Sequence, residues 1–400
     1  MKKVILPSLL LSLACPAPPA AHAGDVHQPA PMPPAIEAPR DVAYAGTVRL
    51  WVDATDLDRK IFRVRESIPV AGPGAATLLY PKWLPGDHGP TGPIGEFAGL
   101  VITASGRPVE WTRDTVEMTA FRVMVPQGAT ALDLEFQCLS PVEARAGSVA
   151  ITPEIVNLEW NTVVLYPAGY YASRIQVEPS VRLPDGWGFG TALETASSSG
   201  GTTHFKVVSL DTLVDSPIFA GRYYRQVDLD PGAAVPVRLN VVADEPGLLE
   251  IGPEALAALR ALPQQAYKLF GARHYDHYDI LLALSDNLGA ASLEHHRSSE
   301  NVTVPTFFTA WGKVVIGRDL VPHEYLHSWN GKFRRPADLW TPDFNVPMRD
   351  SLLWVYEGQT DYWGKMMTAR TGFLSKQQAL DLLAWEAATF DNRPGRSWRP

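Results

Sequence analysis

The sequence predicts a multidomain protein in which an all-β sandwich or saddle-like domain precedes an α+β domain. Hydrophobic residues alternate with polar ones in many short runs over residues 42–243, and Gly and Pro punctuate the turns between these runs. From residue 244 onward several segments change to helical hydrophobic spacing, with further strands between them. A chain of 400 residues is long enough for two domains with substantial cores.

The N-terminus has the pattern of a bacterial-type signal peptide over residues 1–23. Lys2 and Lys3 precede a short apolar run, and an A-x-A site then allows cleavage between Ala23 and Gly24. The apolar run is too short to span a bilayer, and no later stretch is long and apolar enough to do so. We therefore expect an exported protein, periplasmic or secreted, without a membrane span.

The chain has two cysteines, Cys15 and Cys138. Lipid attachment at Cys15 is the alternative to simple cleavage, although the residues before it fit a lipid-attachment site poorly. Cys138 continues an alternating strand pattern, so we expect a buried core thiol rather than a nucleophile. Residues 24–41 are rich in Pro and Ala and are predicted to form a disordered leader to the mature domain.

Composition excludes some partner classes. The formal net charge is −8 and no basic stretch stands out, which argues against nucleic acid as a partner. Hydrophobic residues make up 46% of the chain and charged residues 20%, which is ordinary for a globular protein. The sequence does not indicate an oligomeric state.

The predicted β domain covers residues 42–243. Alternation is clearest in Val48–Val52, Leu132–Phe136 and Val237–Val241, as expected of strands with one buried face. The segment Trp83–Gly86 is interpreted as a structural turn whose Trp packs at the domain boundary, and a substrate-side loop is the alternative.

The predicted catalytic domain covers residues 244–400 and begins with a helix that has Pro253 near its start. Buried strands are expected at residues 277–284, 293–296 and 302–308. Helices are expected around residues 320–327, 353–357 and 377–390, and the strands followed by helices define an α+β domain.

The sequence His323-Glu324-Tyr-Leu-His327 is an H-E-x-x-H motif. Two His four positions apart lie on one helix face and can bind one ion, while the Glu between them can accept a proton from an activated water. Glu357, on an expected second helix, supplies a third ligand and leaves one tetrahedral position open. The pattern therefore predicts one catalytic Zn²⁺ per chain, bound by His323, His327 and Glu357, with Glu324 as the general base of a hydrolase.

The alternative to a metal site is a surface helix with two solvated His. Leu320, Val321 and Leu326 oppose this alternative, because they give the helix a buried side. Pro322 suits the first turn of a helix better than its interior, which predicts a helix start near residues 319–321.

Four stretches carry a resemblance to a known family. The segments 321–330 and 353–362 resemble the metal-binding helices of the glycyl aminopeptidase family of gluzincin metallopeptidases. Trp83–Asp87 is similar to a Trp-x-Pro-Gly signature of that family, and residues 289–299 resemble its substrate-binding strand. The resemblance runs from about residue 42 to residue 400.

The resemblance implies a thermolysin-like catalytic domain and a zinc aminopeptidase that removes small N-terminal residues, Gly or Ala. It implies that Glu294 pairs with the α-ammonium of a peptide substrate, with an ordinary strand-end carboxylate as the alternative. Relatives often have Asn where this chain has His295, so the chain departs from the family's amine-binding pattern at this position. His295 is a candidate contact to substrate or to a metal ligand, and a plain surface His is the alternative. Asp361 and Tyr362 are expected in similar supporting positions, although Asp361 also fits an exposed helix face.

The resemblance also implies that further helices, an oxyanion-stabilising Tyr and a PDZ-like domain follow residue 400. Two other functions remain open from the sequence. One is a gluzincin endopeptidase, which would also cleave N-blocked peptides, and the other is a non-catalytic peptide-binding protein with the same fold. The intact Glu324 counts against the second of these.

Overall fold

The structure is a computed structural model that describes residues 29–289, 292–313 and 315–397. The expected signal peptide, Cys15 and the first residues of the leader lie outside the described residues. The contacts divide the chain into Met1–Pro34 and Ala35–Pro400, and the second unit contains every strand and helix of the described residues.

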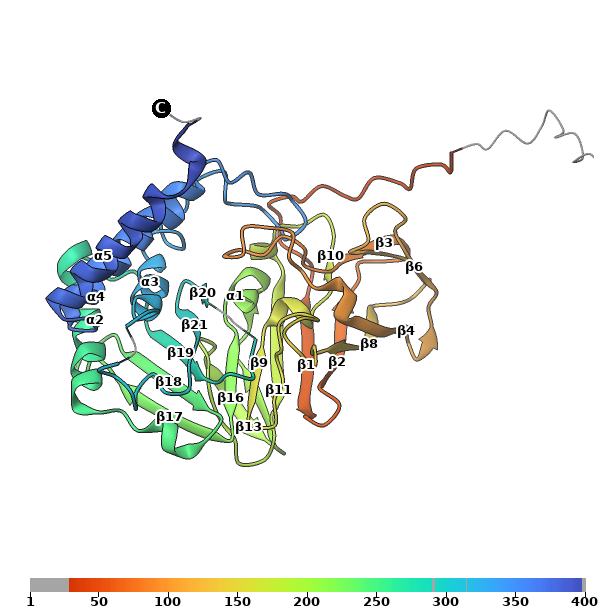
Figure 1. The fold of residues 1–400 in the computed structure, drawn as a ribbon. Helices are drawn as coiled ribbons and strands as arrows, with labels where there is room; N and C mark the ends of the chain where they lie inside the picture. The colour runs from red at the N-terminus through yellow and green to blue at the C-terminus, as the bar shows by residue number, and fades with distance from the viewer. Residues whose placement is uncertain (1–28, 290–291, 314, 398–400) are drawn as a thin grey trace, which may run out of the picture. The chain divides into compact units, whose positions relative to one another are not determined.

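The N-terminal region is built from three sheets (Figure 1). In the described residues, the largest has nine strands: β13 (Thr195–Ser199), β14 (Thr202–Phe205), β11 (Gln176–Arg182), β1 (Thr47–Asp56), β2 (Ile61–Pro69), β8 (Ala131–Leu139), β4 (Phe97–Ala104) and β5 (Arg107–Pro108), with β15 (Val208–Ser209) paired to β11. The second has four: β10 (Tyr166–Pro167), β3 (Gly74–Leu79), β7 (Ala120–Val125) and β6 (Trp111–Arg113). The third joins β12 (Gly188–Gly190), β16 (Ile218–Gly221) and β9 (Ile155–Leu158), and α1 (Leu210–Val214) lies nearby in sequence.

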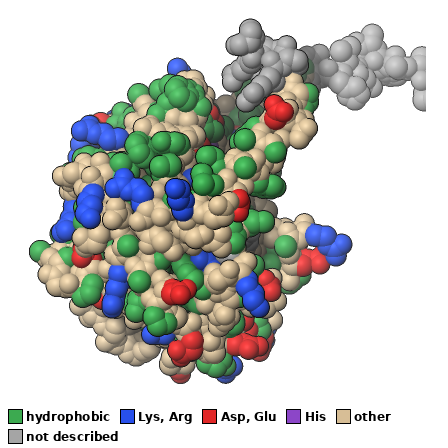
Figure 2. All heavy atoms as spheres, turned by 60° about the vertical axis from the view of Figure 1, so that its left-hand side comes forward, with side chains coloured by type: hydrophobic (Ala, Val, Ile, Leu, Met, Phe, Trp, Pro, Cys, Tyr) green, Lys and Arg blue, Asp and Glu red, His purple; other side chains and the backbone are tan. Residues whose placement is uncertain are grey.

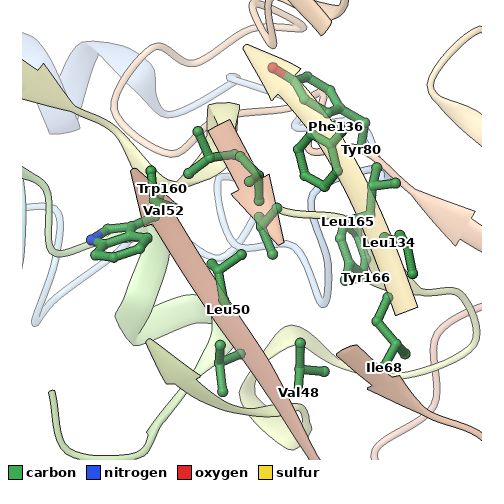
Figure 3. Close-up of a cluster of buried hydrophobic side chains, with 14 of the residues drawn as sticks. Val48, Leu50, Val52, Ile68, Tyr80, Leu134, Phe136, Trp160, Leu165 and Tyr166 are labelled. Carbon is green, nitrogen blue, oxygen red and sulfur yellow. The ribbon is translucent and has the colours of Figure 1, made fainter. Parts of the chain in front are cut away.

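The core of this region is continuous between the two larger sheets. Val48, Leu50 and Val52 on β1 are at most 1% exposed, while their neighbours along the strand are less buried, as the alternating sequence predicts. Figure 3 shows these side chains beside Leu134 and Phe136 of β8. Cys138 on β8 is buried as well, which confirms the predicted core thiol.

The C-terminal region is a five-stranded sheet flanked by helices. Its order is β17 (Tyr223–Asp228), β18 (Val237–Ala243), β19 (Tyr278–Leu284), β21 (Ser298–Thr303) and β20 (Ser292–Glu294). The three inner strands are parallel, and the two edge strands run antiparallel to their neighbours. Every residue of β19 is buried, as expected of a central strand covered on both faces.

Of the four helices in the described residues of this region, one precedes the metal motif, one contains it and two follow it. They are α2 (Pro253–Phe270), α3 (Leu320–His327), α4 (Gln359–Thr371) and α5 (Lys376–Asp391), with a turn of π-helix at Trp354–Gly358, labelled η5. Helix α3 contacts β20, β21 and α4. Short 3₁₀ turns occur at Ile94–Glu96, Trp160–Thr162, Ala172–Arg174, Pro246–Leu249 and Pro394–Ser397. A β-rich region followed by an α+β region is the fold class that the sequence predicts.

Three details differ from the sequence-based expectations. The strand expected at 302–308 is β21, which ends at Thr303 before Pro305, a residue without the N–H that pairing needs. Strands β17 and β18 belong to the C-terminal sheet, so the sheets favour a boundary near residue 222 rather than the expected 243. Part of the expected leader is ordered by contacts, because the N–H of Arg40 donates to the carbonyl of Gly169 at 3.1 Å.

Exposed hydrophobic side chains gather on α5. Leu380, Leu383, Trp385 and Phe390 are each about half exposed, between 49% and 60%. Figure 2 brings this side of the molecule forward and shows hydrophobic side chains interspersed with basic ones. None of the helices in the described residues combines the length and hydrophobicity needed to cross a membrane.

We expect Leu134→Ala to lower the free energy of unfolding by about 2–5 kcal/mol, because the cavity it leaves lies between the two larger sheets. Val101→Ala on β4 is the control, since Val101 is 53% exposed and should change the stability by less than about 0.5 kcal/mol. Urea unfolding followed by circular dichroism measures both. Equal effects of the two substitutions would contradict the packing described here.

Candidate metal centre

The structure brings His323, His327 and Glu357 together. The Nε2 atoms of His323 and His327 are 2.9 Å apart, and each lies 3.4–3.5 Å from Oε2 of Glu357. Two ligands about 2.1 Å from one ion at tetrahedral angles are separated by about 3.3 Å, so the three atoms have the spacing of a zinc site. Two imidazoles and a carboxylate also form a donor set that zinc accepts.

Both helices that supply these side chains are held closely together. Helix α3 begins after Asp319, and Pro322 occupies its first turn, as predicted. Helix α4 lies so near α3 that a Cβ on Gly364 would come 3.1 Å from Cα and Cβ of His323. Glu357 is placed by η5, a π-helical turn at the start of α4, and such turns are frequent at functional sites.

Asn330 fixes the two helices in register. Its side-chain amide donates to the carbonyls of Val355 and Tyr356, at 3.0 and 3.3 Å, and to the hydroxyl of Thr360 at 2.9 Å. Its own carbonyl lies 3.0 Å from Nδ1 of His327. An Nδ1–H directed at this carbonyl leaves Nε2 of His327 free to bind a metal, the arrangement by which metal-binding His residues are usually oriented.

A third histidine, His88, reaches the centre from the N-terminal region. Its Nε2 lies 2.8 Å from Oε1 of Glu357, the carboxylate oxygen that faces away from the two other His residues. The ring of His88 also makes an edge contact with Tyr356. His88 and Glu357 are 269 positions apart, and no local sequence pattern pointed to His88.

The loop that carries His88 follows the Trp83–Gly86 turn. The backbone N–H groups of Lys82 and Trp83 donate to the carbonyl of Phe344, and this anchors the turn at the boundary of the two regions. Gly86 has a φ of +95°, and a Cβ there would lie 2.7 Å from Leu293 and about 3.1 Å from the carboxylate of Glu294. The turn is therefore anchored to Phe344 and lies against Leu293 and Glu294, beside the centre.

Glu324 is positioned to exchange protons in the centre. Its side chain is buried, and its carboxylate lies within 4.8 Å of a nitrogen of His327 and an oxygen of Glu294. Burial raises the pKa of Glu324 well above its ordinary value, and the carboxylates of Glu294 and Glu357 raise it further. The result is a stronger proton acceptor than a solvated carboxylate.

Glu294 is buried at the end of β20 and accepts a hydrogen bond from the hydroxyl of Tyr356. Burial alone would raise its pKa, but His327, Lys332 and this hydrogen bond bring the pKa below its ordinary value. Glu294, Glu324 and His327 form a second group close enough to bind a cation. It has one imidazole where the first group has two, so the first group fits zinc better.

Three other residues singled out from the sequence lie elsewhere. His295 is buried between Asp215 and Glu300, at 3.2 and 3.3 Å, and does not contact the three candidate ligands. Asp361 forms an ion pair with Lys365 on the outer side of α4. Tyr362 is 56% exposed and contacts Trp363. The structure places none of the three against a candidate ligand.

The fold and this centre together define a metallopeptidase-like protein. Two sequence models of one family match the chain: the Peptidase M61 N-terminal domain at residues 49–222 and the M61 glycyl aminopeptidase at residues 317–400. Together they match more than half of the chain, which belongs to the M61 glycyl aminopeptidase family. This confirms the resemblance, and the first match ends where β17 begins the C-terminal sheet.

Solved structures agree on the fold. An aminopeptidase N family protein from Idiomarina loihiensis superposes with a TM-score of 0.69 at 18% identity, over 84% of this chain and 57% of that one. This chain thus spans less than two thirds of that protein. A variant of an M1 zinc metallopeptidase from Deinococcus radiodurans, bound to a Tyr-Ser-Ala substrate, superposes with a TM-score of 0.52 at 14% identity, over 88% and 76% of the two chains. No curated protein sequence matches this chain.

We expect His88→Ala to weaken zinc binding by about 10- to 100-fold, because it removes the hydrogen bond that orients Glu357. Competition with a chromophoric chelator measures the zinc Kd. His323→Ala should bring the zinc content from about one per chain to near zero, and His204→Ala, a substitution on distant β14, should leave the Kd unchanged. An unchanged zinc Kd in His88→Ala would show that His88 does not support Glu357.

Proposed function

We propose that this protein is a zinc aminopeptidase that hydrolyses the first peptide bond of peptides with a small N-terminal residue, Gly or Ala. The observation that carries the proposal is the position of Glu294. Its buried carboxylate lies within 4.8 Å of Glu324 and His327, at the end of an edge strand. A peptide that adds to this edge can bring its α-ammonium to Glu294 and its first carbonyl to the metal centre.

The chemistry follows from the positions of the side chains. His323, His327 and Glu357 would hold zinc, which when bound polarises a carbonyl and lowers the pKa of water. Glu324 accepts the proton of the attacking water and returns it to the departing amine. Its low exposure and the carboxylates beside it favour this role, because they make it more basic.

Glu294 supplies the selection for a free N-terminus. Lys332, His327 and the Tyr356 hydroxyl keep its carboxylate ionised despite its burial. An ionised carboxylate in a buried site attracts the α-ammonium strongly and fixes the distance from the N-terminus to the cleaved bond. The loop at Gly86 packs closely against Leu293 and Glu294, which supports a preference for a small first side chain.

The runner-up is an endopeptidase with the same metal centre. It would bind peptides across the centre and would make no use of a buried carboxylate at the strand end. In the described residues Glu294 is hydrogen-bonded to Tyr356 and makes no direct ion pair, which favours the aminopeptidase because the carboxylate keeps its charge for a ligand.

Glu324→Gln should retain zinc and lose activity on Ala-amides by at least about 10²-fold, because the amide cannot accept a proton. Zinc analysis and steady-state kinetics on the same preparations measure the two effects. Glu178→Gln on the exposed side of β11 is the matched control. Parent-level turnover by Glu324→Gln would exclude Glu324 as the base.

Glu294→Gln should lower kcat/KM on Gly- and Ala-amides at unchanged zinc content. The amide keeps an acceptor for Tyr356 but loses the charge, which should cost about 2–4 kcal/mol of binding in the transition state. The parent should cleave a Gly-initiated peptide and leave its N-acetylated form intact. Equal cleavage of the free and acetylated peptides would reject the aminopeptidase and support the endopeptidase.

A further inference from the structure

A cavity of about 370 Å³ lies beside the metal centre. Its volume falls within the roughly 300–1,000 Å³ typical of ligand-binding cavities. Hydrophobic side chains such as Phe62, Leu84 and Leu293 form part of its wall. Four carboxylates also line it: Asp87, Glu96, Glu159 and Glu300.

Among the described residues that line this cavity there is no Lys, Arg or His. Two neighbouring cations are already engaged: Lys332 pairs with Asp215 at 2.9 Å, and His295 lies between Asp215 and Glu300. No ion pair within the described residues involves Glu159. The wall of the cavity therefore has four carboxylates and no cation of its own in the described part of the chain.

Two of the carboxylates have raised pKa values. Burial raises the pKa of Glu159 to about 8, and the neighbouring Glu300 and Asp87 add to the shift. Burial likewise raises the pKa of Glu96 to about 7. Both shifts mean that the charged form of these carboxylates is unfavourable in the cavity, and that a bound cation would stabilise it.

Glu300 points to a ligand independently. It is 0% exposed and lines this cavity, yet its Oε1 has no hydrogen-bond partner in the described part of the chain. Its other oxygen is engaged with His295 at 3.3 Å. A buried carboxylate oxygen without a partner is costly, so a donor from a ligand would satisfy it.

The arrangement of the carboxylates favours an organic cation over a metal ion. Within the described residues, groups of three ligand atoms close enough for one ion occur only at the metal centre, and none includes Glu159 or Glu300. The carboxylates of the cavity are spread along a wall that is partly hydrophobic. This combination suits an ammonium or guanidinium group at the end of an alkyl chain.

Two segments connect the cavity with the metal centre. Ser292 and Leu293 line the cavity, and the next residue of the strand is Glu294. Asp87 lines it as well, and the next residue is His88, which contacts Glu357. A peptide that places its amine at Glu294 and pairs antiparallel with β20 runs back along Leu293 and Ser292, past the cavity.

We propose that this cavity binds the basic side chain, Lys or Arg, of the residue that follows the cleaved bond. The inference rests on the proposed aminopeptidase function, because it takes the amine position from Glu294. It adds a second determinant of specificity: a small first residue, followed by a basic second residue whose cation meets Glu159 and Glu300.

The test compares Ala-Lys-amide with Ala-norleucine-amide, which has a neutral side chain of similar length. We expect kcat/KM to be about 10- to 100-fold higher for the Lys peptide, the effect of one charge-assisted hydrogen bond, with the difference mainly in KM. Glu159→Gln should reduce this ratio at least severalfold. The exposed Glu178→Gln serves as the control and should preserve it.

Calorimetric binding of the two peptides to zinc-loaded Glu324→Gln protein tests the cavity even if the protein does not cleave them. The Lys peptide should bind about 10- to 100-fold more tightly there as well. If the parent protein cleaves neither peptide but the binding preference is intact, the proposed function is overturned and the cavity assignment stands. Equal binding of both peptides, or a preference that Glu159→Gln leaves unchanged, would overturn the cavity assignment. The single-residue amides Lys-amide and norleucine-amide provide a further control. If the protein prefers Lys-amide over norleucine-amide but does not prefer Ala-Lys-amide over Ala-norleucine-amide, the cavity assignment is overturned, because the cavity would then hold the side chain of the first residue.

Discussion

The geometry of the centre depends on Asn330. Its amide holds the turn that presents Glu357, while its carbonyl fixes the ring of His327, so one residue sets the relative position of ligands from two helices. Gly331 follows with a φ of +134°, and a Cβ there would come 2.5 Å from the ring of Tyr356. The close approach of this ring lets its hydroxyl reach Glu294. A short segment after the metal helix thus organises the ligands and the carboxylate proposed to bind the substrate amine.

Negative charge is concentrated around this segment. The pKa of Glu324 is raised by three neighbouring carboxylates, those of Glu294, Glu357 and Glu300. Buried carboxylates at such spacing repel one another unless cations accompany them. Lys332 and the histidines supply part of this positive charge. A divalent metal, the α-ammonium of a peptide and a basic side chain would each supply more, at three neighbouring positions.

The sequence predicts those features that depend on neighbouring residues. The spacing of His323 and His327 on one helix follows from helix geometry, and the alternation in β1 follows from the strand repeat. Glu357 was predicted as the third ligand on an expected second helix, and the family resemblance around it supported this choice, because nothing local links it to a motif 30 positions earlier. His88 could not be found from the sequence, since only the tertiary fold brings it to Glu357. His295 lies between Asp215 and Glu300 and away from the three candidate ligands, and its role as a substrate contact stays a prediction.

The contact between His88 and Glu357 has a thermodynamic consequence, because it joins the N-terminal β region to the C-terminal α+β region. A ligand that binds only the folded state stabilises it by RT ln(1 + [L]/Kd), which is about 4 kcal/mol at a thousandfold excess over Kd. Since one oxygen of Glu357 faces the zinc ligands and the other faces His88, part of this stabilisation is transmitted to the interface. Zinc would thereby make the two regions unfold as one cooperative unit. Without zinc, the loop that carries His88 would separate from the metal-binding helices before the hydrophobic core of either region unfolds.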